Sequence, residues 1–334
     1  MMRSACLYGN QLRIEERPEP TPAQGELLVA VDHAGVCGSD LHADTYGLPD
    51  GFVLGHEISG EIVDVGGDLA RSRIGQRVAV MPVIGCSQCG PCLSGDPTHC
   101  RTYRALGVTA AGGFADLVVS GDRETFRLPD HLGYDLGALV EPLAIGLHTV
   151  RRARLDGFER VLVIGAGPIG LAVTAWLVAH GVHGVVVSDP VDARRTLAVG
   201  FGASATIDPI SGDVAREFRS ACGRKPDVIF DCAGGRLGDA VRLVSRGGRI
   251  VVAGYHHQPV PIDTQVALVK ELEIVFTSWY TTAEFTHTID AVARDRLPFE
   301  SMITHRVTLD ELPAAYAALK HPNDEGKVLV SLRS

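Results

Sequence analysis

Hydrophobic and polar positions divide the chain into two kinds of segment. From residue 12 to about residue 140, short apolar runs such as 27–31, 61–65 and 77–80 are separated by Gly and Pro. Runs of this length between turn-forming residues are typical of β-strands. The first segment is therefore predicted to form an irregular, barrel-like β domain.

From about Arg160 onward, strand-like and helical runs alternate. Strands are predicted at 161–164, 185–187, 205–207, 227–231 and 249–253, and helices at 169–180, 193–200, 213–222 and 237–244. Continuous apolar strands alternating with helices indicate a parallel sheet that helices cover on both faces. The tail from residue 298 ends in another strand-like run. Because this tail resembles the first segment more than the second, we expect it to pack back onto the first.

Composition and charge exclude some classes of function. The chain has 334 residues, 46% of them hydrophobic, and a formal net charge of −9. A negative field opposes binding to nucleic acid, whose phosphates require neutralising cations. No stretch approaches the roughly 20 apolar residues of a membrane span, and residues 1–22 lack the apolar core of a signal peptide. We therefore expect a cytoplasmic protein that binds neither nucleic acid nor membrane.

A glycine-rich run directly follows the first of the parallel strands. It reads Gly165-Ala-Gly167-Pro168-Ile169-Gly170 and opens a predicted helix. The first glycine permits a tight turn, the second allows backbone to approach a pyrophosphate, and the third lets helix and strand pack closely. The helix N-terminus then offers free N–H groups to phosphates. The run predicts a dinucleotide site.

Asp189 ends the second parallel strand, nineteen residues after Gly170. A carboxylate at this distance accepts hydrogen bonds from the adenosine ribose and repels a 2′-phosphate, which favours NAD over NADP. Arg194 and Arg195 lie close enough to face a phosphate, although solvated positions on the following helix are the more common fate of such charges. We assign Arg194 to the cofactor site.

Four of the eight cysteines are clustered within fifteen positions. Cys86, Cys89 and Cys92 are spaced by two residues, and Cys100 follows after seven. Four thiolates complete a tetrahedral zinc site and leave no open position, so the site would be structural. The spacing is also similar to that of iron–sulfur ligands, but the wider final interval favours zinc.

Three further short segments contain side chains that can bind a metal or transfer a proton. They are Cys37-Gly-Ser39-Asp40, Gly55-His56-Glu57-x-x-Gly60 and Val140-Glu141-Pro142-Leu143-Ala144. Singly, each cysteine or histidine is more often a buried, satisfied side chain than a ligand. Together with the four-cysteine lobe and the glycine-rich run, in this order, they resemble the zinc-containing medium-chain dehydrogenase family, and most closely its sorbitol, threonine and butanediol dehydrogenase branch.

The resemblance implies a fold and an assembly. It implies a GroES-like β-barrel catalytic domain over 1–146 with a zinc lobe at about 86–100, a doubly wound Rossmann NAD-binding domain over 147–291, and a C-terminal return over 292–334. It also implies a homodimer or homotetramer with two zinc ions in each subunit, one catalytic and one structural.

The resemblance also assigns ligands to the catalytic zinc. Cys37 and His56 match two ligands, and Glu141 falls at the place of the third, where the ethanol-oxidising branch has a cysteine. Glu57 matches an acid beside the zinc that binds it directly or through water. As three protein ligands, Cys37, His56 and Glu141 leave one vertex of a tetrahedral zinc open.

The resemblance assigns proton chemistry to the residues around Cys37. Ser39 matches the hydroxyl that exchanges a proton with the substrate alcohol, and His42 falls where some members end a proton relay. Asp40 matches the acid that orients His56. Gly38 replaces a basic residue of the ethanol-oxidising branch, in agreement with the polyol branch.

The function implied is hydride transfer between NAD(H) and a secondary alcohol or polyol and its ketone. A biosynthetic ketone or aldehyde reductase of the same family, or a non-catalytic homologue that binds NAD and zinc, remain alternatives. The substrate pocket is expected near Tyr46, Phe52, Trp279 and Tyr280. Two histidines, at 256 and 257, are interpreted as polar loop residues near the cofactor rather than metal ligands. Cys222 and Cys232 are expected to be ordinary buried thiols.

Overall fold

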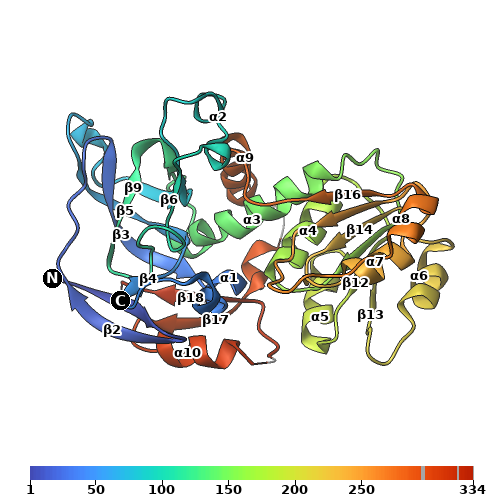
Figure 1. Ribbon diagram of the computed structural model, residues 1–334. Helices are drawn as coiled ribbons and strands as arrows, with labels where there is room; N and C mark the ends of the chain where they lie inside the picture. Colours follow the sequence, from blue (N-terminus) through green and yellow to red (C-terminus); the bar gives the residue numbers. More distant parts are fainter. Residues whose placement is uncertain (295–297, 322, 334) are drawn as a thin grey trace. The chain divides into compact units, whose positions relative to one another are not determined.

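The computed structural model describes residues 1–294, 298–321 and 323–333 (Figure 1). It consists of two compact units: Met1–Glu141 with Tyr280–Ser334, and Pro142–Trp279. The family resemblance implied boundaries after residues 146 and 291. The chain returns to the first unit already at Tyr280, because the segment after Trp279 makes its contacts with the first unit. There, the backbone N–H of Thr282 donates to the carbonyl of Gly95 at 2.9 Å.

Most strands of the first unit belong to one seven-stranded sheet. The order is β10-β6-β5-β3-β18-β17, with β9 also paired to β3. The bounds are β3 Glu26–Gly35, β5 Glu57–Val65, β6 Arg77–Val80, β9 Leu117–Gly121, β10 Thr125–Arg127, β17 Ile303–Thr308 and β18 Lys327–Ser331. Strand β18 runs antiparallel to β3, with Val330 opposite Ala34. The tail therefore adds its last strand to the N-terminal sheet.

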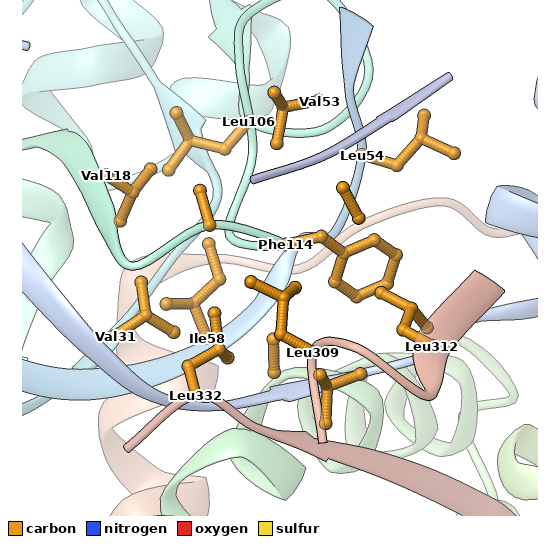
Figure 2. Packing of buried hydrophobic residues seen from close by; sticks show 14 of the residues in the cluster. Val31, Val53, Leu54, Ile58, Leu106, Phe114, Val118, Leu309, Leu312 and Leu332 are labelled. Carbon is orange, nitrogen blue, oxygen red and sulfur yellow. The ribbon is translucent and has the colours of Figure 1, made fainter. Parts of the chain in front are cut away.

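Shorter elements complete the first unit. The strands are β1 Met2–Tyr8, β2 Gln11–Arg17, β4 Phe52–Val53, β7 Val83–Ile84 and β8 Arg104–Ala105. The helices are α1 Gly38–Leu41, α2 Gly90–Leu93, α9 Thr282–Ala293 and α10 Leu312–Leu319, with 3-10 turns η1 Ala43–Tyr46, η2 Arg71–Arg73, η3 Pro97–His99, η4 Asp122–Glu124 and η5 Phe299–Met302. The core gathers side chains such as Val31, Ile58 and Leu312 around the ring of Phe114 (Figure 2).

The second unit is a parallel sheet with the strand order β13-β12-β11-β14-β15-β16. Its strands are β11 Val161–Ile164, β12 Val185–Ser188, β13 Ala205–Ile207, β14 Val228–Asp231, β15 Arg249–Val252 and β16 Glu273–Phe276. The connecting helices are α4 Pro168–Ala179, α5 Asp192–Gly200, α6 Val214–Cys222, α7 Leu237–Leu243 and α8 Thr264–Lys270. In chain order this is the 3-2-1-4-5-6 arrangement of a Rossmann fold, which binds ligands where the order reverses, beyond β11 and β14. The predicted α/β fold class is confirmed.

One long helix was not predicted. Helix α3 spans Tyr134–Arg152 and contains Pro142 in its interior. From the sequence, the β-rich segment was predicted to end at about residue 140, and no helix was predicted here. An interior proline removes a helical hydrogen bond and commonly ends a helix. Residues of the helix such as Leu139 and Leu143 are fully buried, and this packing outweighs the proline. Among the described residues, no helix combines the length and hydropathy needed to cross a membrane.

Candidate active site

Cys37, His56 and Glu57 are brought together in the first unit. Each offers one ligand atom, and these atoms all lie within 4.8 Å of one another. Cys37 follows β3 as the N-cap of helix α1, while His56 and Glu57 stand at the entrance to β5. His56 and Glu57 are buried. A thiolate, an imidazole and a carboxylate that converge in a buried site form a donor set suited to zinc.

Glycines make room for this group. Gly55, directly before His56, has φ +93°, and a Cβ there would stand 2.6 Å from the ring of Phe114. A Cβ on Gly35 would stand 1.8 Å from Glu57 Oε2. The close approach of backbone to ring and carboxylate therefore requires glycine at both positions.

Asp40 supports the group from behind. Its carboxylate accepts a hydrogen bond from the backbone N–H of Cys37 at 2.9 Å, and its Oδ1 lies 3.5 Å from His56 Nδ1. Burial lowers the pKa of His56, but the charges of Asp40 and Cys37 outweigh it and raise the pKa well above its usual value. The site thus stabilises positive charge, as a metal site must. His56 Nδ1 is buried and has no hydrogen-bond partner among the described residues.

Lys327 is a residue of this site that the sequence did not reveal. Its Nζ contacts Glu57 Oε1 at 2.5 Å and Oε2 at 2.7 Å, and donates to the carbonyl of Val36 at 3.0 Å. Lys327 and Glu57 are 1% and 0% exposed, so the ion pair is fully buried. Burial lowers the pKa of Lys327, but Glu57 and the nearby Cys37 outweigh it and the pKa is raised. The sequence signal was a lysine directly before the apolar run 328–330 at the start of β18.

Glu141 lies near these residues, but it does not belong to the group whose ligand atoms all lie within 4.8 Å of one another. Its Oε1 accepts a hydrogen bond from the Tyr280 hydroxyl at 3.1 Å, and both residues are buried. Burial raises the pKa of Glu141 to about 7, although the charge on His56 acts in the opposite direction. The carboxylate that the structure gathers with Cys37 and His56 is therefore Glu57, and the predicted third ligand is bound to a tyrosine.

Ser39 and His42 lie on and just after the short helix that Cys37 caps. Ser39 is half-buried within α1, and His42 is exposed at its C-terminal end. Asp40, between them, is buried, and its carbonyl accepts a hydrogen bond from the hydroxyl of Tyr316 at 2.8 Å. One helical turn therefore leads from the ligand group towards solvent.

The four-cysteine lobe forms a second group of candidate ligands. The sulfur atoms of Cys86, Cys89, Cys92 and Cys100 lie within 4.8 Å of one another. Backbone N–H groups of Cys86 and Thr102 lower the pKa of Cys100 to about 6, whereas burial and the Cys89 thiol raise the pKa of Cys92 to about 12. With four thiol ligands, the set fits a closed tetrahedral zinc site.

The glycine-rich run occupies the predicted place in the second unit. Gly165 has φ +95° in the turn after β11, and Gly167 is the N-cap of α4 with Pro168 as its first residue. A Cβ on Gly170 would stand 1.8 Å from the carbonyl oxygen of Gly165, whereas a Cβ on Gly167 would meet nothing within 4 Å. Together with half-buried Ile169, the run leaves open space at the helix N-terminus, where a pyrophosphate binds in this fold.

Asp189 is held against this turn. Its Oδ2 accepts the backbone N–H of Ala166 at 2.7 Å, and its Oδ1 accepts the N–H of Val191 at 2.8 Å. Each carboxylate oxygen has a second lone pair for a ligand. Arg194 is half-buried on α5, and Arg195 is bound to Asp192 and to the carbonyl of Asp189.

Other residues singled out from the sequence are placed as follows. Tyr280 is buried at the site, while Tyr46 and Phe52 are half-buried in the first unit. His256 and His257 lie in the loop after β15, and neither belongs to a candidate metal group among the described residues. Cys222 and Cys232, which were expected to be buried, are partly exposed, and desolvation raises the pKa of both thiols.

Comparison with known proteins agrees with both units. Residues 23–130 match the alcohol dehydrogenase GroES-like domain, and residues 168–294 match the zinc-binding dehydrogenase domain. Starvation-sensing protein RspB of Escherichia coli K12 is 36% identical over 89% of this chain and 88% of its own. L-galactonate-5-dehydrogenase of the same organism is 32% identical over 93% of each chain. Sorbitol dehydrogenase of Bacillus subtilis is 29% identical over 98% and 97%.

Solved structures share the whole architecture. The alcohol dehydrogenase RspB from Escherichia coli CFT073, in complex with NADH, has a TM-score of 0.91 and 34% identity, covering 99% of both chains. A zinc-binding dehydrogenase from Sinorhizobium meliloti 1021, bound to NADP, has a TM-score of 0.88 and 31% identity over 99% of both chains. The fold, the ligand group and these similarities show that the chain belongs to the zinc-containing medium-chain dehydrogenase family of oxidoreductases.

Proposed function

We propose that this protein is an NAD-linked, zinc-dependent dehydrogenase that oxidises a secondary alcohol of a polyol or sugar acid to the ketone, and catalyses the reverse reduction. The observation that carries the proposal is the convergence of half-buried Cys37 with buried His56 and Glu57 in one group of potential ligands. Support for the substrate class comes from relatives whose names give a sugar acid or a sugar alcohol as substrate.

Cys37, His56 and Glu57 would hold the catalytic zinc, with Glu141 beside them. Zinc bound there would supply a Lewis acid that lowers the pKa of a coordinated hydroxyl. Asp40 orients this set through the backbone of Cys37 and its position beside His56 Nδ1. The negative charge of Asp40 beside Nδ1 would favour the ring orientation in which the other nitrogen faces the metal.

Ser39 and His42 would handle the substrate proton. Ser39 would accept the hydroxyl proton during oxidation, and His42, exposed at the end of the same turn, would pass it to solvent. During reduction the proton would move in the opposite direction. The side chains therefore provide a short relay in which each group has the donor and acceptor capacity that the step needs.

We propose NAD rather than NADP as the preferred cofactor. Gly165, Gly167 and Gly170 shape the pyrophosphate site, and Asp189 presents a carboxylate next to it. This negative charge would accept ribose hydroxyl groups and repel a 2′-phosphate. Arg194, which lies close enough to face a phosphate, opposes this preference. The RspB complex contains NADH and the Sinorhizobium protein NADP, so the family accommodates both cofactors.

We propose a second, structural zinc at Cys86, Cys89, Cys92 and Cys100, assembly as a homodimer or homotetramer, and a cytoplasmic location. All eight cysteines are free thiols, and a thiolate cluster of this kind persists in a reducing compartment. Light scattering on the purified protein tests the assembly, and metal analysis tests the expected two zinc ions per chain.

The function is tested by a substrate panel with two variants. Nicotinamide reduction is followed with sugar acids, sugar alcohols and simple secondary alcohols, with and without a chelator. His56→Ala is expected to abolish turnover and to lose the catalytic zinc while NADH still binds to the second unit. His305→Ala, which changes an exposed histidine of β17, is the matched control and should retain activity. Full activity in His56→Ala would refute the proposal.

A further inference from the structure

Tyr280 places a hydroxyl on one of two buried carboxylates near the candidate zinc ligands. The hydroxyl donates to Glu141 Oε1 at 3.1 Å, and Tyr280 and Glu141 are 2% and 3% exposed. The other carboxylate, Glu57, has both oxygens on Lys327. The two acids therefore have different partners: one has a cation and the other a neutral donor.

The ring of Tyr280 is held firmly in place. It stacks on Phe285 with ring centroids 5.6 Å apart and an interplanar angle of 19°. Phe285 in turn packs against Phe126 at 5.2 Å. Thr281, the next residue, caps helix α9 in a capping box with Glu284, which fixes the backbone directly after the tyrosine.

The backbone before Tyr280 is strained in a way that only firm packing can maintain. Trp279 has φ +60°, the left-handed region that a bulky side chain rarely adopts. Such a conformation is unfavourable and persists only where the surrounding contacts hold it in place. The chain thus accepts local strain at the residue that precedes the hydroxyl donor.

Glu57 and Glu141 compete in principle for the same metal, and only Glu57 belongs to the group of ligand atoms within 4.8 Å. We propose that Tyr280 is a positioning residue that selects between these two carboxylates. By holding Oε1 of Glu141, it keeps this acid out of the ligand set, so that Cys37, His56 and Glu57 bind the metal. The vertex for substrate then stays open, as a catalytic zinc requires. The inference rests on the proposed zinc-dependent function.

The test uses Tyr280→Phe, which removes the hydroxyl and keeps the stacked ring. Released from its donor, Glu141 is expected to join the ligands and close the open vertex. Zinc release to a chelator should then slow by about tenfold, which is within the roughly 10–100-fold range by which partners of metal ligands change metal affinity. The absorption spectrum of the cobalt-substituted enzyme should change and no longer respond to added alcohol. The kcat should fall while NADH affinity stays the same.

Two further variants separate this role from a loss of packing. In Tyr280→Phe combined with Glu141→Gln, the acid that would intrude is gone, so zinc release should return to the wild-type rate. Tyr8→Phe is the matched control, because it removes a tyrosine–glutamate hydrogen bond of 2.6 Å, to Glu15, in the β1–β2 hairpin. Its zinc release and cobalt spectrum should equal those of the wild type.

Other outcomes refute specific claims. An unchanged cobalt spectrum and release rate in Tyr280→Phe, or faster release that the Glu141 substitution does not correct, would overturn the selection of carboxylates by Tyr280. If the wild-type protein binds zinc only at the four-cysteine lobe, the proposed function itself fails, and the cobalt spectrum of the wild type shows this before any variant is made.

Discussion

Removal of the Lys327 charge should expose how strongly the buried carboxylate beside the ligands depends on its partner. Lys327→Met keeps the length of the side chain and deletes the ammonium group that contacts both oxygens of Glu57. Because the two residues are 1% and 0% exposed, solvent cannot replace the lost charge. Breaking a buried pair from one side costs about 3–5 kcal/mol, and that loss is expected in the metal-free protein.

The assay must report on the first unit. Both tryptophans, Trp176 and Trp279, lie in the second unit, so tryptophan fluorescence would miss the transition. Hydrogen–deuterium exchange of the β5 and β18 peptides, with urea unfolding followed by circular dichroism, measures the correct region. In a double-mutant cycle with Glu57→Gln, the paired variant should recover most of the loss, because neither charge then remains buried alone.

Metal and pH give two further checks on the same pair. Zinc bound near Glu57 would supply positive charge in place of the lysine, so the loss should be smaller in zinc-loaded protein. The pKa of Lys327 is raised in the folded state. Its contribution is therefore fully present below the unfolded value of about 10.4 and disappears only as pH rises through the folded pKa. The contribution of the Lys327 charge to the stability of the wild type should therefore be constant from about pH 6 to about pH 9. A loss below about 1 kcal/mol in metal-free protein would refute the reasoning.

Three other predictions concern the remaining sites. Gly170→Ala places a Cβ 1.8 Å from a backbone oxygen and should destabilise the second unit by about 1–3 kcal/mol. The Cβ of Gly167→Ala meets nothing within 4 Å, so this variant should fold normally but bind NADH more weakly. Equal NADH affinity of Gly167→Ala and wild type in calorimetric titration would contradict the assigned pyrophosphate site. Cys89→Ser should lose one zinc per chain and melt at a lower temperature, while the control Cys222→Ser should do neither; unchanged metal content in Cys89→Ser would exclude the closed site. Asp189→Asn should reduce the preference for NAD over NADP by about tenfold or more, because a hydrogen bond to a charged group is worth about 1.5–3 kcal/mol. If the ratio of the kcat/KM values for NAD and NADP did not change, the Asp189 carboxylate would not be the group that discriminates between the cofactors.

Local patterns in the sequence determined the second unit and the four-cysteine group, whereas the candidate catalytic ligands in the first unit came from the resemblance to the dehydrogenase family. The strand expected at 161–164 is found at Val161–Ile164, because a continuous apolar run needs only its own residues to indicate a buried strand. The glycine-rich turn and the four-cysteine lobe are equally local, since their spacing carries the chemistry.

Tertiary structure alone decided which groups meet at the candidate active site. Lys327 reaches Glu57 across 270 positions of sequence, and Tyr280 reaches Glu141 across 139. No periodicity or spacing reports on such pairs, because they arise when β18 pairs with β3 and when the segment after Trp279 returns to the first unit. Helix α3 likewise forms around Pro142 because its buried face is stabilised by packing that no local propensity describes. The sequence named the residues that can bind a metal, and long-range packing determined which carboxylate stands among them.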